Sequence, residues 1–149
     1  MSSTQQPEPA EVTFYEVVGG HPFFQRLVAR FYEGVAADPV LTAMYPEDDL
    51  GPASERLRMF LEQYWGGPTT YSDLRGHPRL RMRHNPYVIG DDARDRWLAC
   101  METALHDQGL PPDLADEMWR YFVMAAFAMT NQPTEVEVRD GLVPPQVNP

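Results

Sequence analysis

The sequence predicts a single all-α domain, and three observations support this fold class. Apolar residues recur at helical spacing in four segments between about residues 12 and 132. Proline or glycine stands at the ends of these segments, where such residues begin or end helices. No stretch within these bounds requires a strand. With 149 residues, the chain is long enough to bury a core of its own.

The first two long helices each have one apolar face. Pro22 suits the first position of the first helix, and Asp38-Pro39 ends it. The second helix ends at Gly66-Gly67-Pro68. The first face carries Phe24, Leu27, Val28, Phe31, Tyr32 and Val35. The second face carries Ala53, Leu57, Phe60, Leu61 and Tyr64.

The last two long helices have recognisable ends as well. We expect Asp91 or Asp92 to cap the third helix, which ends near Gly109. Pro111 and Pro112 begin the fourth helix. The third apolar face carries Trp97, Met101, Ala104 and Leu105. The fourth apolar face carries Leu114, Met118, Tyr121, Phe122, Ala125 and Met129.

The composition bounds the location and the partners of the chain. Twelve basic residues against 22 acidic ones give a formal net charge of −10, which argues against a nucleic-acid partner. The single cysteine, Cys100, allows no internal disulfide and fits a reducing compartment. No apolar run reaches the roughly 20 residues of a membrane span, and the N-terminus has no signal-peptide pattern. We expect a cytoplasmic domain at 12–132, with a disordered arm at 1–11 and a proline-bearing tail at 133–149.

The connection between the second and third helices is unusually long. It runs from Gly66 to Asp91, whereas roughly 2–8 residues join helices in bundles. Within it, residues 75–87 hold four of the twelve basic residues and two of the four histidines. Gly76-His77-Pro78 and Asn85-Pro86 limit any helix between them to one or two turns. Such a connection is more typical of a binding site than of a simple bundle.

Three kinds of site lack the residues that they need. A structural zinc site is disfavoured by the single cysteine and by Pro78, which prevents one straight helix from presenting both His77 and His84. A nucleophilic triad is disfavoured because Ser54 and Ser72 lie in no G-x-S-x-G context. No glycine-rich phosphate loop is present.

A haem site requires only one imidazole, an apolar slot and cations for the propionates. His84 is a candidate, because its Nδ1–H can donate to a carbonyl group of the preceding turn, such as that of Leu80, and leave Nε2 for iron. The alternative is a surface histidine in a basic loop. The neighbouring arginines can pair with propionates or form a solvated face that balances local acids. These arginines are Arg79, Arg81 and Arg83.

Three polar aromatic residues stand on otherwise apolar segments. Tyr32 lies in the first helix, Tyr45 precedes Pro46, and Trp97 lies in the third helix. Buried tyrosine and tryptophan usually find a partner for their O–H or N–H group. Each of them alone is compatible with an ordinary core residue. If the three converge on one pocket, they form a hydrogen-bonding cage for a small ligand.

Four blocks of sequence carry a family resemblance, namely residues 31–32, 40–41 with 45–50, 55–68 and 75–84. These blocks resemble the group II truncated haemoglobins (the O class) in an actinobacterial form, and the resemblance covers about residues 12–132. It implies a shortened globin in which two helix pairs sandwich haem b, with a minimal first helix.

The resemblance also implies a role for each matching residue. His84 would be the proximal iron ligand, with Tyr32, Tyr45 and Trp97 as the distal donors. Ala53 stands where longer globins place a distal histidine or glutamine, so it cannot hydrogen-bond and leaves room for ligand entry. Further haem-packing residues would be Leu57, Phe60, Leu80, Met82 and Tyr87. Propionate partners would be Arg56, Tyr64, Arg79 and Arg83.

The function that these expectations favour is binding or transport of O2, with CO and NO as alternative ligands, at a five-coordinate haem iron. A second hypothesis is a haem redox enzyme, either peroxidase-like or an NO dioxygenase, which would need an external reductase because the chain has no flavin or nicotinamide domain. A haem-free helical interaction module is the third, and an absent Soret band would establish it. A homo-oligomer is compatible with all three.

Overall fold

The computed structural model describes residues 12–45, 49–76 and 89–130. Within these ranges the chain is helical and contains no strand, so the all-α prediction is confirmed. The predicted arm at 1–11, the predicted tail at 133–149 and the segment that holds His84 lie outside the described residues. The helices are α1 (Phe14–Val18), α2 (Gly20–Ala36), α3 (Pro39–Thr42), α4 (Gly51–Tyr64), α5 (Thr70–Arg75), α7 (Asp91–His106) and α8 (Pro112–Met129).

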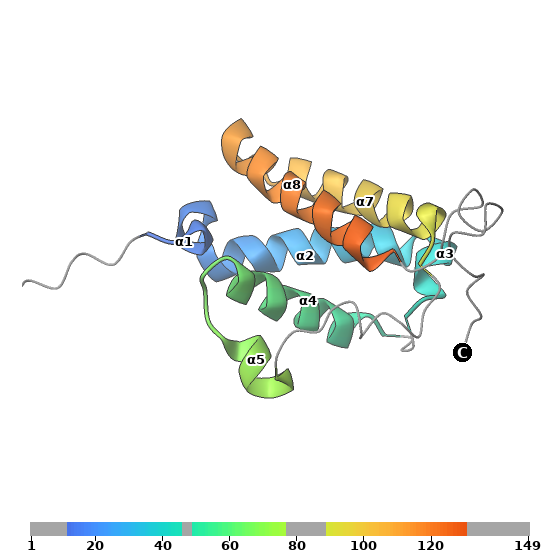
Figure 1. The fold of residues 1–149 in the computed structure, drawn as a ribbon, viewed down its shortest axis with the longest axis horizontal. Helices are drawn as coiled ribbons and strands as arrows, with labels where there is room; N and C mark the ends of the chain where they lie inside the picture. The colour runs from blue at the N-terminus through green and yellow to red at the C-terminus, as the bar shows by residue number, and fades with distance from the viewer. Residues whose placement is uncertain (1–11, 46–48, 77–88, 131–149) are drawn as a thin grey trace, which may run out of the picture.

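Helix α2 is the central element of the fold. It packs against α4 on one side and against α7 on the other, and α7 in turn packs against α8 (Figure 1). The α2–α4 pair and the α7–α8 pair thus form two layers of helices, the two-over-two arrangement. In Figure 1 the short helix α3 lies at the C-terminal end of α2, and α5 follows α4.

The apolar face predicted for the first long helix forms the centre of the core. Phe24, Leu27, Phe31 and Val35 have no exposed surface, and Val28 is 1% exposed. Burial of each such side chain stabilises the fold by roughly 1.5–3 kcal/mol relative to an exposed position. The remaining residue of the predicted face, Tyr32, is only half-buried.

Helix α1 is held against the end of α4 by backbone contact. The Tyr15 N–H donates to the Trp65 carbonyl at 2.9 Å. A Cβ at Gly67 would lie 2.7 Å from Cδ1 of the Tyr15 ring and 2.8 Å from the Glu62 carbonyl oxygen. The glycine that was predicted only as a helix breaker therefore also allows α1 to approach α4.

Two predicted helix starts differ in detail from the structure. Helix α2 begins at Gly20, so Pro22 stands within its first turn, where its missing N–H would have no helical partner anyway. The predicted caps of α7 were wrong, because Gly90 occupies the cap position with no side-chain bond. Asp91 and Asp92 instead lie in the first turn, where negative charge interacts favourably with the helix dipole.

Helices α2 and α7 cross closely at a glycine. A Cβ added at Gly34 would lie 2.9 Å from Cys100 Sγ and 3.7 Å from its Cα. This close approach brings Trp97, one turn before Cys100, against the aromatic face of α2, where its ring lies 5.1 Å from that of Phe31. Within the described part, no helix combines the length and apolar character that a bilayer crossing requires.

Candidate functional site

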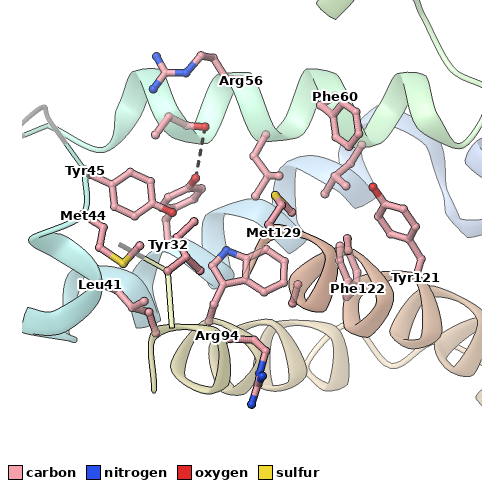
Figure 2. Close-up of a pocket in the computed structure, with 18 of the residues that line it drawn as sticks. Tyr32, Leu41, Met44, Tyr45, Arg56, Phe60, Arg94, Tyr121, Phe122 and Met129 are labelled. Carbon is pink, nitrogen blue, oxygen red and sulfur yellow. Dashed lines mark hydrogen bonds between the residues drawn. The ribbon is translucent and has the colours of Figure 1, made fainter. Parts of the chain in front are cut away.

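A cavity of about 530 Å³ lies between the two helix layers (Figure 2). Residues of α2, α4, α7 and α8 line it, together with the segment that includes α3 and with α5. Its walls are mostly apolar. The lining residues are Tyr32, Leu41, Met44, Tyr45, Ala53, Arg56, Leu57, Phe60, Leu61, Tyr71, Arg75, Ile89, Ala93, Arg94, Trp97, Tyr121, Phe122, Ala125, Ala126 and Met129.

The cavity brings together most of the site residues that the sequence predicted within the described ranges. Those that line it are Tyr32, Tyr45, Ala53, Arg56, Leu57, Phe60 and Trp97. Tyr64 is not among them: it is 49% exposed and stacks on Tyr121, with ring centroids 4.1 Å apart. The other predicted site residues lie outside the described ranges, and they are Arg79, Leu80, Met82, Arg83, His84 and Tyr87.

Tyr32 and Tyr45 form one pair of hydroxyl groups in the cavity, although they come from different elements. Their ring centroids are 5.8 Å apart, nearly edge to face. The Tyr32 hydroxyl donates to the Ala53 carbonyl oxygen at 3.4 Å, the dashed line in Figure 2. Burial raises the pKa of Tyr45, and a hydrogen bond with Tyr32 only partly offsets that effect. The Tyr45 phenol therefore stays protonated at neutral pH and is able to donate a hydrogen bond.

Trp97 contributes a third polar group from the opposite layer. Its ring packs edge-on against Phe31 at 5.1 Å and tilts toward Phe122 at 6.1 Å. Among the residues that the structure describes, its Nε1–H has no hydrogen-bond acceptor. A half-buried indole N–H without an acceptor at a cavity wall is suited to donate to a ligand in that cavity.

Arginine side chains border the cavity without filling it. Figure 2 shows Arg56 and Arg94 directed away from the other labelled lining residues. The Arg94 guanidinium lies 4.1 Å from the centroid of the Phe127 ring and pairs with Asp91 at 2.9 Å and Asp95 at 3.0 Å. The Arg94 charge is therefore neutralised by two acids of its own helix, although the residue also lines the cavity.

Several lining residues were missed by sequence reasoning. Tyr71 and Arg75 belong to α5, a helix that the sequence did not predict, and Ile89 lies just before α7. The α8 lining residues were predicted as an apolar face, but as core rather than as a cavity wall. Nothing in the spacing of an apolar face distinguishes these two surroundings. The α8 residues from the predicted face are Tyr121, Phe122, Ala125 and Met129, and Ala126 lines the cavity in addition.

The described part of the cavity meets two of the three requirements of a haem site, the apolar slot and the cations. Its volume lies in the range of about 300–1,000 Å³ typical of cofactor pockets. It offers apolar walls for a macrocycle, arginines at its border for propionates, and three polar aromatic donors on the walls. Of the described histidines, His21 and His106 are exposed and neither lines the cavity.

Comparison with known proteins identifies the class of protein that this fold and cavity define. Residues 13–131 match the bacterial-like globin family. The chain therefore belongs to the bacterial-like globins and, within them, to the group II truncated haemoglobins. Globins of this family carry haem b, which agrees with the apolar cavity and its polar aromatic residues.

Individual relatives agree in sequence and in structure. The chain is 38% identical over 125 residues to the group 2 truncated hemoglobin YjbI of Bacillus subtilis, a match that covers 84% of this chain and 92% of that protein. The thermostable hemoglobin of Thermobifida fusca is 66% identical, with a TM-score of 0.81, and the match covers 82% of this chain and 99% of that one. The truncated oxygen-avid haemoglobin from Bacillus subtilis is 36% identical, with a TM-score of 0.75 and coverage of 80% and 99%.

Proposed function

We propose that this protein binds O2 reversibly, with CO and NO as alternative ligands, and that Tyr32, Tyr45 and Trp97 hold the ligand by hydrogen bonds. Haem b, when bound, supplies the iron at which a diatomic ligand binds. The observation that carries the proposal is the convergence of these three residues, from α2, the segment after α3 and α7, on one otherwise apolar cavity.

The hydrogen-bonding strength of these groups supports O2 as the ligand. Each net hydrogen bond contributes about 0.5–1.5 kcal/mol, which slows ligand release by about 2- to 10-fold per donor. The Tyr32 bond to the Ala53 carbonyl is long at 3.4 Å and therefore weak. The oxygen-avid relative from Bacillus subtilis fits the same expectation.

His84 is the proposed proximal iron ligand. Arg75 and Ile89, which stand just before and just after residues 77–88 in the sequence, both line the cavity. The histidines of the described part, His21 and His106, do not line the cavity. An imidazole from the 77–88 segment is therefore the one that we propose as the iron ligand.

The remaining haem contacts follow from the same arrangement. Ala53, Leu57 and Phe60 line the cavity from α4 and are proposed to pack on the macrocycle. Arg56 borders it and is proposed to meet a propionate. Tyr64, which is half-exposed and stacks on the lining residue Tyr121, is proposed as a second propionate partner at the edge of the cavity. From the undescribed segment we propose Leu80, Met82 and Tyr87 as packing residues and Arg79 and Arg83 as propionate partners.

The test compares ligand release from the purified holoprotein and from a triple variant, Tyr32→Phe, Tyr45→Phe and Trp97→Phe. We expect a Soret band in both proteins and, from the loss of three donors, O2 release at least about 10-fold faster in the variant. A matched control, Tyr15→Phe with Trp119→Phe, changes aromatic residues that do not line the cavity and should release O2 at the wild-type rate. Equal rates in all three proteins would contradict the role of the donors, and a wild-type protein without a Soret band would contradict haem binding.

A further inference from the structure

Asp38 connects the three elements that carry the polar aromatic residues of the cavity. It lies in the two-residue link between α2, which carries Tyr32, and α3, which leads to Tyr45. Arg96 of α7, the neighbour of Trp97, donates from Nη1 to both carboxylate oxygens of Asp38 at 3.1 Å. The Asp38 side chain therefore contacts α7, which carries Trp97, and the Asp38 backbone belongs to the link between α2 and α3.

The same carboxylate also forms the start of α3. Its Oδ1 accepts hydrogen bonds from the backbone N–H groups of Val40 at 3.0 Å and Leu41 at 3.4 Å. The backbone carbonyl of Asp38 accepts the N–H of Thr42 at 3.0 Å. Helix α3 has four residues, and such a short helix has almost no intrinsic stability in water. Its position must therefore come from tertiary contacts, of which the buried Leu41 and the Asp38 carboxylate are two.

We propose that the Asp38–Arg96 pair is a positioning pair, which holds Tyr45 at a fixed distance from Trp97 across the cavity. This inference rests on the proposed function, because it assigns to the pair the geometry of the proposed donors. Arg96 precedes Trp97 on the rigid helix α7, so an anchor at Arg96 also fixes the Trp97 backbone. Asp38 fixes the start of α3, whose end leads through Met44 to Tyr45 at the cavity wall.

Arg96 also forms an ion pair that has no such positioning role and can serve as a comparison. Arg96 has a second partner, Asp92, which accepts from Nε at 2.9 Å but stands on α7 itself. Asp92 is 71% exposed and its partner among the described residues lies on the same helix, whereas Asp38 is 18% exposed and joins the start of α3 to α7. An exposed ion pair such as Asp92–Arg96 contributes little to stability. The two carboxylates therefore form a matched set: both bind Arg96, but only Asp38 connects Arg96 to another element.

The experiment compares Asp38→Asn with Asp92→Asn in the holoprotein. The Asp38→Asn side chain would keep an oxygen for the α3 cap but lose the charge that faces Arg96. We expect Asp38→Asn to release O2 about 2- to 10-fold faster, the effect of one weakened hydrogen bond. We also expect a second carbonyl-stretching band in the CO-saturated protein and a shifted or doubled indole N–H signal of Trp97 in NMR spectra, the latter assigned by its loss in Trp97→Phe. Asp92→Asn should match wild type in all three measurements.

Two further variants separate the positioning inference from the proposed function. Arg96→Met leaves the α3 cap intact and should reproduce the Asp38→Asn spectra, so it replaces Asp38→Asn if that variant fails to fold. Tyr45→Phe reports on the proposed function itself. If Tyr45→Phe and Trp97→Phe both release O2 at the wild-type rate, the proposed donor role of these two residues fails, and the positioning inference fails with it. If they release it faster while Asp38→Asn and Arg96→Met match Asp92→Asn, the positioning inference alone is overturned.

Discussion

Gly34 of α2 and Cys100 of α7 meet so closely that a Cβ at position 34 would lie 2.9 Å from the cysteine sulfur. The two residues belong to the helix layers that carry Tyr32 and Trp97, respectively. The spacing of α2 and α7, and with it the distance between the Tyr32 and Trp97 sides of the cavity, therefore depends on the absence of a side chain at position 34.

Gly34→Ala should test this contact. Alanine gains about 1 kcal/mol in helix propensity over glycine, but overpacking in a core typically costs about 1–3 kcal/mol. We therefore expect a net loss of stability, measured as a lower urea midpoint of unfolding. In a Cys100→Ala background the sulfur is gone, so the same substitution should be less harmful or even stabilising. An equal effect in both backgrounds would show that the contact does not limit helix approach.

His84→Ala should abolish stable haem retention, because the proposed proximal ligand supplies the imidazole that binds iron. Absorbance at the Soret band relative to 280 nm, measured after gel filtration, gives the haem content. His77→Ala is the matched control, since it removes the other histidine of the same basic segment and should retain haem. If His84→Ala kept the wild-type haem content and spectrum, the proximal assignment would be wrong.

Trp97→Phe should accelerate O2 release by about 2- to 10-fold, since it removes one hydrogen-bond donor while conserving most of the ring packing on Phe31 and Phe122. Stopped-flow displacement of O2 by CO measures this rate. Trp119→Phe, on α8 and outside the cavity lining, serves as the control. A release rate equal to that of Trp119→Phe would remove Trp97 from the set of donors.

Asp38 should make the stability of the protein depend on acidity. Burial by itself would raise the pKa of Asp38, but hydrogen bonds from Arg96 and from the N–H groups of Leu41 and Val40 outweigh it, so the pKa lies below its usual value of 3.8. The stabilisation by this carboxylate is then fully present above the unfolded pKa of about 3.9 and is lost as pH falls through the lower folded pKa.

Urea unfolding of wild type and Asp38→Asn at several pH values measures that dependence. The difference between their free energies of unfolding should be constant from pH 7 to about 5 and should shrink below about pH 4. In an Arg96→Met background the pH-dependent part should be smaller, because the strongest pKa-lowering bond is absent. A difference that stays constant down to pH 2 would refute the assigned pKa shift.

The long helices could be predicted because their apolar faces repeat at a local spacing. The face of α2 from Phe24 to Val35 is buried as expected, and the helix ends lie within a few residues of the proline and glycine signals. The three polar aromatic residues were noticed for a similar reason, since each interrupts an apolar segment. That they line one cavity was expected from the family resemblance and not from their spacing.

The parts that could not be predicted depend on contacts between distant residues. Helix α3 is held by Asp38, whose partner Arg96 is 58 positions away, and no local pattern indicates that pair. Helix α5 is likewise anchored from outside, because Gln63 Nε2 donates to Ser72 Oγ at 2.7 Å and the Gln63 side-chain oxygen accepts the Ser72 N–H. Arg75 and Tyr71 became cavity residues through that anchoring.

Arg94 of α7 belongs both to the cavity lining and to a charged cluster on its own helix. Its guanidinium lies over the Phe127 ring and pairs with the exposed carboxylates of Asp91 and Asp95. Substitution of either exposed acid therefore removes one of the two ion pairs that hold a side chain of the cavity lining. At this position a change of surface charge on α7 is therefore also a change at the wall of the cavity.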